Sequence, residues 1–319
     1  MRPRLAVNIG KLKLKNPVMV ASGTFGYAEE FKDFLDLNKL GAIVTKTITL
    51  KPRQGNRCPR TCETPSGMLN SIGLENPGIE AFIREKLPHL AEYGVPVIFS
   101  ISSEEDPKEF TELAKILDNI KLAAAIELNI SCPNIHEGRG TRDEGRRLIA
   151  QDAHATYEVV KAVRRVTAKT LITKLSPNIT DITEIAQAAE DAGSDAIALI
   201  NTLIGMSIDV ASRKPKVAAV TAGLSGPAIR PVAVRMVWEV FRKIKIPIIG
   251  MGGIMDTSSA LEFFLAGASA VAVGTANFIN PSAAVEIIAG LKNYLNKHRI
   301  KDVKSLIGNL DTPHLRVGN

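Results

Sequence analysis

The chain has 319 residues, enough to bury a large core without disulfides or metals. Hydrophobic residues make up 45% and charged residues 23%, which is ordinary globular composition. The formal net charge of +7 suits anionic ligands, nucleic acid among them. However, the basic residues are spread along the chain and only 5% of residues are aromatic, so the basic and aromatic stripe of a single-stranded nucleic acid binder is missing. We therefore expect no nucleic acid partner.

The absence of a recognisable targeting signal and the pattern of cysteines predict a cytoplasmic protein. Residues 1–16 contain no apolar run of signal-peptide length, and no stretch reaches the ~18 apolar residues of a membrane span. Cys58, Cys62 and Cys132 are odd in number and lack the spacing of a disulfide framework. Cys58 and Cys62 resemble half of a metal site, but a second pair is missing. We expect a soluble chain with no membrane anchor and no metal.

In chain order, the first predicted element is a hairpin within residues 1–16, where LAVNI and KLKLK flank Gly10. Eight short segments follow that are continuously apolar and rich in β-branched residues, which is typical of parallel strands covered on both faces. The predicted strands are 17–22, 42–47, 96–101, 124–130, 170–175, 196–201, 247–251 and 270–274.

Amphipathic helices are predicted between these strands. The periodic apolar positions are Ile182, Ile185, Ala186 and Ala189 in one helix and Leu261, Phe264, Leu265 and Ala268 in another. Both helices end at a glycine, Gly193 or Gly267, a residue favoured just past a helix end.

The alternation of strand and helix predicts a parallel sheet, and eight parallel strands close naturally into a (β/α)8 (TIM) barrel of the α/β class. We expect residues 1–319 to form one domain. The hairpin would then close the amino-terminal face, and residues 49–78, rich in Pro, Gly and Asn, would cross the opposite, active face. The alternative is an open doubly wound sheet, but the sequence has neither a G-x-G-x-x-G turn after the first strand nor a P-loop.

Polar or glycine-rich residues follow every predicted strand, where the active site of a barrel lies. Lys46 and Lys174 end two strands, although lysine is rarely buried without a partner or a function. Gly252-Gly253 and Gly274-Thr275 follow strands seven and eight, the loops that commonly hold phosphate in this fold.

Cys132 lies just past strand four in a polar, amide-rich environment, so we interpret it as a general base rather than an inert core residue. His136 is an alternative base. Lys174 could stabilise a reduced flavin near N1. The competing chemistry is a Schiff-base aldolase in which one of the two lysines is the nucleophile.

Nine segments together resemble the dihydroorotate dehydrogenase family, more narrowly its soluble NAD-linked branch, class 1B. They are NPVMVASGTFGYAEE (16–30), GAIVTKTITLKPRQGN (41–56), TPSGMLNSIGLENPG (64–78), IELNISCPN (126–134), ITKLSPN (172–178), ALINT (198–202), GLSGPAIRP (223–231), IIGMGGI (248–254) and AGASAVAVGTANF (266–278). The resemblance runs from end to end.

The resemblance implies FMN-dependent oxidation of (S)-dihydroorotate to orotate in pyrimidine biosynthesis, with Cys132 as the base. It implies that FMN is bound by Ser22, Lys46, Thr47, Asn129, Lys174, Ile200, Gly226, Gly252, Gly253, Gly274 and Thr275, with Ser100 as a further candidate. It implies that substrate is bound by Lys46, Asn70, Ser71, Ile72, Gly73, Leu74, Asn129, Asn134, Asn201 and Thr202.

The resemblance also implies a homodimer within a heterotetramer, whose second subunit carries FAD and a [2Fe–2S] cluster and passes electrons to NAD. Such a cluster needs four ligands, usually cysteines, and three cysteines are present here. Two features depart from the family pattern. The expected substrate lid after Asn134 is unusually charged, IHEGRGTRDEGR, and Glu75 stands where Gln is expected. A fumarate-linked dehydrogenase and a dihydropyrimidine-type flavin enzyme remain alternatives.

Overall fold

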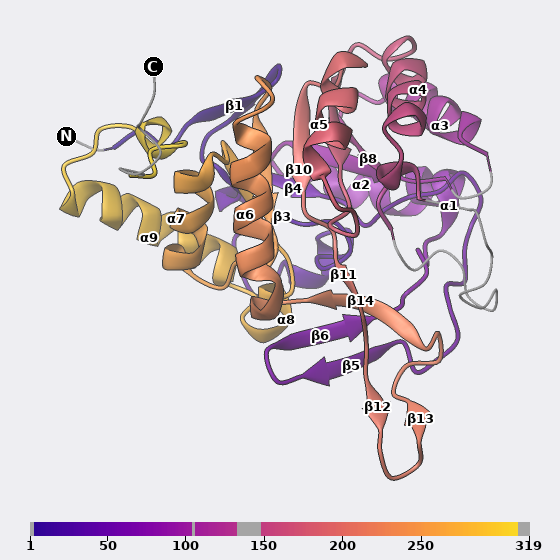
Figure 1. Cartoon of the computed structure of the whole chain (residues 1–319). Helices are drawn as coiled ribbons and strands as arrows, with labels where there is room; N and C mark the ends of the chain where they lie inside the picture. Colours follow the sequence, from indigo (N-terminus) through magenta and orange to yellow (C-terminus); the bar gives the residue numbers. More distant parts are fainter. Residues whose placement is uncertain (1–2, 104–105, 133–147, 312–319) are drawn as a thin grey trace.

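The computed structural model describes residues 3–103, 106–132 and 148–311 of the chain. Eight parallel strands form a closed barrel (Figure 1). They are β3 Val18–Val20, β4 Ala42–Val44, β7 Val97–Ile101, β8 Ala123–Asn129, β9 Thr170–Lys174, β10 Ala196–Leu199, β15 Ile248–Met251 and β16 Ala270–Val273. The predicted barrel is confirmed. The open-sheet alternative is wrong, because β16 pairs with β3 and closes the ring.

Each barrel strand lies within a predicted one or differs from it by a single residue, but most are shorter at the carboxyl end. The segment predicted as 42–47 shows the cause. The backbone N–H of Lys46 donates to the carbonyl of Gly26 at 2.9 Å, outside the ladder with the neighbouring strand. The chain turns away from the sheet here, which frees the following side chains to converge on the barrel mouth.

Helices cover the outside of the barrel (Figure 1). The α-helices are α1 Gly78–Ala81, α2 Leu87–Leu90, α3 Lys108–Asp118, α4 Ala153–Arg164, α5 Ile182–Asp191, α6 Arg230–Phe241, α7 Thr257–Ala266, α8 Ala276–Ile279 and α9 Ala283–Lys297. A π-helical segment, Phe82–Lys86, joins α1 to α2. Short 3-10 turns occur at Glu29–Phe31, Leu37–Lys39, Ile149–Gln151, Pro227–Ile229 and Val303–Leu306.

The predicted apolar face is confirmed for α5 and in part for α7, where Phe264 and, just past the helix, Ala268 are buried as predicted. All four periodic positions of α5 are buried. In α7 the buried apolar side chains include Ala260, Phe263 and Phe264, whereas Leu261 and Leu265 are half-buried. The reason is Gly250 on β15, which leaves room for the Phe263 ring; a Cβ added at Gly250 would lie 2.5 Å from Phe263 Cδ1.

The predicted amino-terminal hairpin is confirmed as β1 Val7–Ile9 and β2 Leu12–Leu14, paired antiparallel. Its turn lies against the amino ends of two barrel strands. The backbone N–H of Lys11 donates to Thr170 Oγ1 at 3.2 Å, and Gly10 is in contact with the Asp195 side chain. The hairpin thus covers the bottom of the barrel, leaving the carboxyl ends of the strands as the open face.

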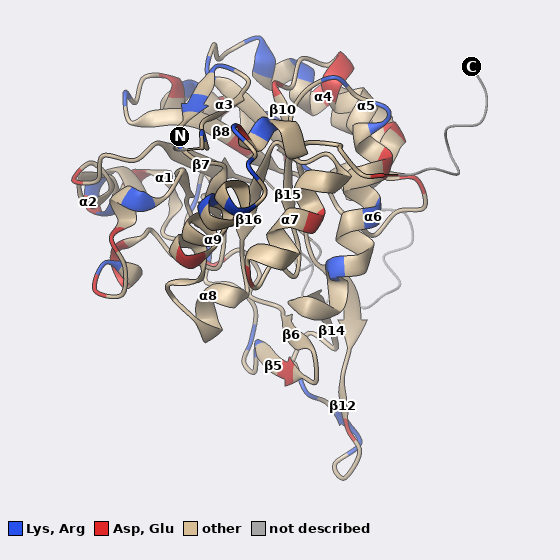
Figure 2. Ribbon diagram, turned by 90° about the vertical axis from the view of Figure 1, so that its left-hand side faces the viewer, with Lys and Arg blue, Asp and Glu red and all other residues tan. Residues whose placement is uncertain are grey.

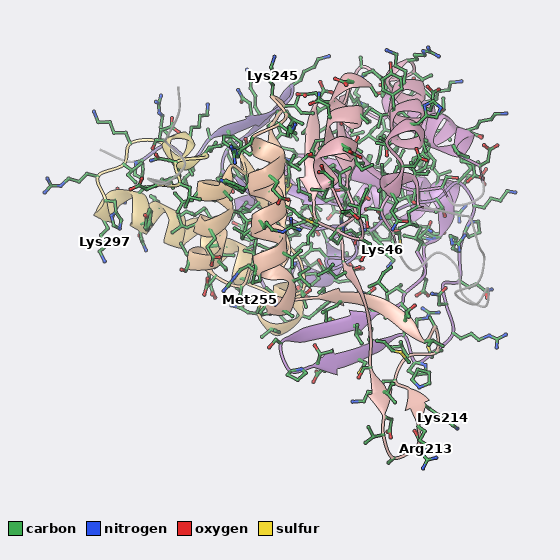
Figure 3. The ribbon with its side chains drawn as sticks, viewed as in Figure 1. Lys46, Arg213, Lys214, Lys245, Met255 and Lys297 are labelled. Carbon is green, nitrogen blue, oxygen red and sulfur yellow. The ribbon has the colours of Figure 1, made fainter. Side chains whose placement is uncertain are left out.

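A second, antiparallel sheet crosses the open face in the order β11, β14, β6, β5. Its strands are β5 Thr61–Thr64, β6 Gly67–Asn70, β11 Leu203–Met206 and β14 Thr221–Ser225. The 49–78 excursion was predicted, whereas its pairing with residues 203–225 was not. From this sheet a two-stranded hairpin, β12 Ile208–Asp209 and β13 Lys214–Pro215, projects away from the barrel (Figure 1), with Arg213 and Lys214 near its tip (Figure 3).

Charged residues of both signs are interspersed over the outer helices and loops (Figure 2), as expected for a solvated surface. Within the described ranges, no helix has the length and apolar character needed to cross a bilayer.

Candidate active site

A cavity of about 330 Å³ opens at the carboxyl ends of the barrel strands, beneath the second sheet. Most of the predicted site residues line it, although they come from segments far apart in the sequence. These are Ser22, Lys46, Thr47, Asn70, Ile72, Gly73, Leu74, Asn129, Cys132, Lys174, Ile200, Asn201, Thr202, Gly226, Gly252, Gly253, Gly274 and Thr275. The fold therefore brings together the residues that we assigned to cofactor and to substrate.

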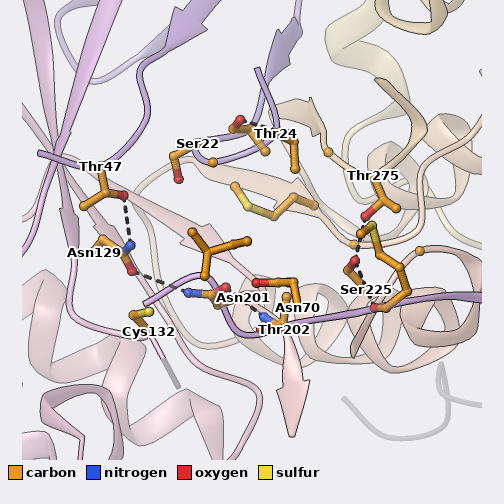
Figure 4. Close-up of a pocket in the computed structure, with 18 of the residues that line it drawn as sticks. Ser22, Thr24, Thr47, Asn70, Asn129, Cys132, Asn201, Thr202, Ser225 and Thr275 are labelled. Carbon is orange, nitrogen blue, oxygen red and sulfur yellow. Dashed lines mark hydrogen bonds between the residues drawn. The ribbon is translucent and has the colours of Figure 1, made fainter. Parts of the chain in front are cut away.

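One end of the cavity is built from amide and hydroxyl groups around Cys132 (Figure 4). The amide of Asn129 donates to Thr47 Oγ1 at 3.1 Å, and its carbonyl oxygen accepts from Ser131 Oγ at 3.1 Å. Asn201 donates to Ser131 Oγ at 2.9 Å. These bonds fix the orientation of both amides beside the Cys132 side chain, which is 8% exposed. Fixed amides of this kind suit a planar ring with alternating carbonyl and N–H groups.

Two lysines give the cavity its positive charge. Burial lowers the pKa of Lys46, because desolvation disfavours the ammonium; Glu75 opposes this shift and Arg60 adds to it. Cys132 lies close enough to Lys46 to oppose this lowering of the lysine pKa as well. Lys46 is half-buried in the cavity wall. Lys174, 4% exposed, donates from Nζ to Ser22 Oγ at 3.1 Å. An anionic ligand would relieve the cost of both buried cations.

The other end of the cavity is formed by glycine-rich backbone. Among the hydrogen bonds of the described residues, the N–H groups of Gly252, Gly253, Gly274 and Thr275 have no acceptor. Gly253 has a φ of +76°, and a Cβ there would lie 2.7 Å from Arg230 Cβ, so only glycine fits. At Gly274 a Cβ would meet nothing closer than 3.8 Å and would enter the cavity. Free N–H groups and open space at one end of the cavity fit a phosphate-bearing cofactor.

The segment between these two ends, residues 70–74, is held rigidly. The backbone N–H of Asn56 donates to the carbonyl of Ile72 at 3.0 Å. Gly73 has a φ of +74° and packs so closely on Asn56 that a Cβ would lie 2.3 Å from its Oδ1. Asn76 Oδ1 accepts from the backbone of Thr49 and of Gly78. The excursion therefore presents a preorganised edge to the cavity rather than a loose turn.

Two of the predicted site residues lie behind the cavity wall. Ser71 is fully buried, and its backbone N–H donates to the carbonyl of Arg60 at 2.7 Å. Ser100 is also fully buried and hydrogen-bonds Thr47 at 3.0 Å, so neither side chain lines the cavity. Asn134, His136 and most of the expected lid lie outside the described residues.

The cavity is also lined by residues absent from the predicted set: Ala21, Gly23, Thr24, Thr61, Met68, Glu75, Ser225, Ile229, Met251 and Phe278. Ala21, Gly23 and Thr24 could have been included, since they flank Ser22 at a strand end. Thr61, Met68 and Ser225 come from the second sheet, which has no local sequence signal. Ser225 accepts from Thr275 Oγ1 at 2.8 Å and thereby joins this sheet to the glycine-rich end (Figure 4).

Comparisons with known proteins agree with this geometry. The sequence profile of the family described as dihydroorotate dehydrogenase matches residues 4–295. A relative from Trichlorobacter lovleyi is 55% identical over 98% of this chain and 100% of its own length, and one from Geotalea uraniireducens is 54% identical over 98% and 99%. The crystal structure of a DHODH from Eimeria tenella in complex with ferulenol superposes with a TM-score of 0.78 at 24% identity, over 96% of this chain and 88% of that one.

The barrel, with polar side chains from most of its strand ends around one cavity, defines a (β/α)8 enzyme, and at these identities the chain belongs to the dihydroorotate dehydrogenase family. The relatives from Trichlorobacter lovleyi and Geotalea uraniireducens are both named dihydroorotate dehydrogenase B (NAD(+)), catalytic subunit. The resemblance to the NAD-linked branch, predicted from nine sequence segments, is thereby confirmed.

Proposed function

We propose that this chain oxidises (S)-dihydroorotate to orotate in de novo pyrimidine biosynthesis, using FMN. The observation that carries the proposal is the two-ended cavity. Oriented amides and a buried thiol lie at one end, and free backbone N–H groups with open space lie at the other. The first end suits the pyrimidine ring of the substrate, and the second suits the phosphate of the cofactor.

We propose residue roles on the basis of this arrangement. The cofactor would be bound by those residues of the predicted FMN set that line the cavity, Lys174 among them. Thr47 connects this set to the buried Ser100. FMN, when bound, would accept the hydride that leaves C6 of the substrate. Lys46, Asn129 and Asn201 orient the substrate ring and its carboxylate. Asn70, Ile72, Gly73 and Leu74 would form the wall against the ring, with Ser71 behind it, and Asn134 is proposed to complete it.

Cys132 is the proposed base that removes the proton from C5 of dihydroorotate. Its support is position: the side chain lines the cavity, follows directly after β8 and lies beside the amides of Asn129 and Asn201. The low exposure of the Cys132 side chain excludes bulk water from the proton transfer, which strengthens electrostatic interactions in the site.

The chain alone is not expected to reduce NAD. We propose a partner subunit carrying FAD and a [2Fe–2S] cluster, in a heterotetramer built on a homodimer of this chain. The words "catalytic subunit" in the names of the relatives support a separate partner. A cytoplasmic location stays a prediction.

An anaerobic absorption spectrum tests substrate and cofactor together. We expect yellow protein whose flavin band bleaches when dihydroorotate is added. Faster bleaching by dihydrouracil would favour a dihydropyrimidine-type enzyme, and turnover with fumarate and no partner would favour a fumarate-linked one. Colourless protein that borohydride inactivates only in the presence of substrate would instead indicate a Schiff-base aldolase.

A further inference from the structure

Glu127 and Lys174 are the two fully buried side chains that carry a carboxyl or an amino group in the described part of the chain. Glu127 is 2% exposed and Lys174 is 4% exposed. The proposed function uses Lys174 and leaves Glu127 without a role. A charge or carboxyl group in a protein interior is costly unless another group compensates it, so the presence of Glu127 needs an explanation.

The sheet register places both side chains inside the barrel. On the adjacent strands β8 and β9, Asn129 pairs with Lys174 and Glu127 pairs with Ile172. Because strand residues alternate between faces, Glu127 points to the same side as Asn129, which lines the cavity. Glu127 is therefore one inward-facing position below the cavity floor, on the strand beside Lys174.

Lys174 extends over this interior position. Its ammonium donates to Ser22 Oγ, just after β3, and β3 lies opposite β9 in the ring of eight strands. The hydrogen bond between Lys174 and Ser22 thus links opposite walls of the barrel. Glu127 lies on the closed side of this hydrogen bond, and the ligand cavity lies on the open side.

The carboxyl group of Glu127 does not have hydrogen-bond partners for both of its oxygens. Its Oε1 atom is buried and has no hydrogen-bond partner among the described residues. The ammonium of Lys174 is hydrogen-bonded to Ser22, and within the described residues no ion pair joins it to Glu127, so any interaction between the two charges acts across a gap or through water. At an interior position the effect of such a charge is screened much less than at the surface.

We propose that Glu127 is a positioning residue: it is the buried counter-charge of Lys174 and reduces the positive field that this lysine presents to the ligand. The part of the inference that concerns the flavin rests on the proposed function. Removing the carboxylate would leave Lys174 a stronger cation, which favours a negatively charged reduced flavin over the neutral oxidised one. Glu127 would thus lower the reduction potential of the cofactor.

The coupling is tested first in the apoprotein, with no cofactor, by a double-mutant cycle of Glu127→Gln and Lys174→Met. Each single change leaves one buried group without its counter-charge, and the double change removes both. We expect the equilibrium constant for unfolding of the double variant to be at least about threefold smaller than the two single effects combined would give. Additive effects would overturn the proposal.

The second test is the midpoint potential of the bound flavin in Glu127→Gln. We expect an upward shift of about 30 mV, a tenfold change for a two-electron couple. Glu112→Gln, at an exposed position on α3, is the matched control and should leave the potential unchanged. Glu127→Asp keeps the charge and should stay near wild type. If the midpoint potential of Glu127→Gln equals that of wild type, or if Glu127→Asp shifts the potential as much as Glu127→Gln does, the carboxylate does not tune the cofactor.

The two tests separate this inference from the proposed function. A wild-type protein that takes up no flavin would contradict the proposed function, while the apoprotein cycle would still measure whether Glu127 and Lys174 are coupled. A wild-type protein that is reduced by dihydroorotate, with no coupling and no shift in potential, would contradict only the role of Glu127.

Discussion

At the residue scale, Cys132 is the side chain on which the proposed chemistry depends. Cys132→Ala removes the thiol at the amide end of the cavity and leaves the glycine-rich end intact, so FMN should remain bound. We expect the rate of flavin reduction by dihydroorotate to fall roughly 100- to 10,000-fold, the usual contribution of a general base. Stopped-flow absorbance measures it, and Cys58→Ala, at an exposed position, is the control. Wild-type reduction in the Ala variant would exclude Cys132 as the base.

Lys46 shows how function costs stability. The pKa of Lys46 in the folded protein lies below the ordinary 10.5, chiefly because burial disfavours the ammonium. Below the folded pKa both states bind the proton and the cost of burial applies in full. Between the folded value and 10.5 the unfolded chain binds more protons, so stability rises with pH.

Lys46→Met should therefore raise the melting temperature of the apoprotein at neutral pH by on the order of 2 °C and flatten its rise with alkaline pH, while abolishing turnover. Thermal melts across that pH range measure both effects. A less stable Met variant with an unchanged pH slope would mean that the buried ammonium does not control the stability at this position.

At the element scale, the loops after β15 and β16 are the proposed phosphate site. Gly274→Ala is an informative change, since the added methyl meets no protein atom closer than 3.8 Å and enters the cavity. We expect an unchanged melting temperature for the apoprotein and a loss of FMN affinity of about tenfold or more, because the methyl displaces the ligand. Fluorescence titration measures this affinity. Gly94→Ala, in a loop before β7 and outside the cavity lining, is the control; equal affinities in both variants would place the phosphate elsewhere.

At the scale of the whole molecule, the three cysteines are dispersed rather than clustered: Cys58 is exposed, Cys62 lies on β5 and Cys132 lines the cavity. Within the described residues no group of cysteine, histidine or acidic side chains is arranged to hold a metal. We expect the FMN-loaded chain to reduce an artificial dye with dihydroorotate but to form no NADH until an FAD and [2Fe–2S] subunit is added. NADH absorbance follows the reaction. NADH formed by the chain alone would contradict the need for a partner.

The sequence by itself determined the barrel, because parallel strands buried on both faces must be continuously apolar and each helix must end before the next strand begins. It also determined which polar residues stand at the strand ends, and eight of these ends in a closed ring meet at one mouth. The sequence did not fully determine which side chains of a helix pack into the core. The apolar face of α7 was predicted only in part, because Gly250 on a neighbouring strand makes room for Phe263, which was not among the predicted positions.

Only the tertiary structure decided which of these residues reach the cavity. Ser71 and Ser100 carry the right chemistry but are buried behind the cavity lining. The second sheet contributes Thr61, Met68 and Ser225, and its strands β6 and β14 pair across about 150 residues of sequence. Residues 1–319 forming a single domain stays a prediction, as do the assigned roles. Local patterns fix the type of an element because they act over a few residues. The inward or outward direction of one side chain, and the partner of a strand at the sheet edge, depend on contacts that exist only once the chain has folded.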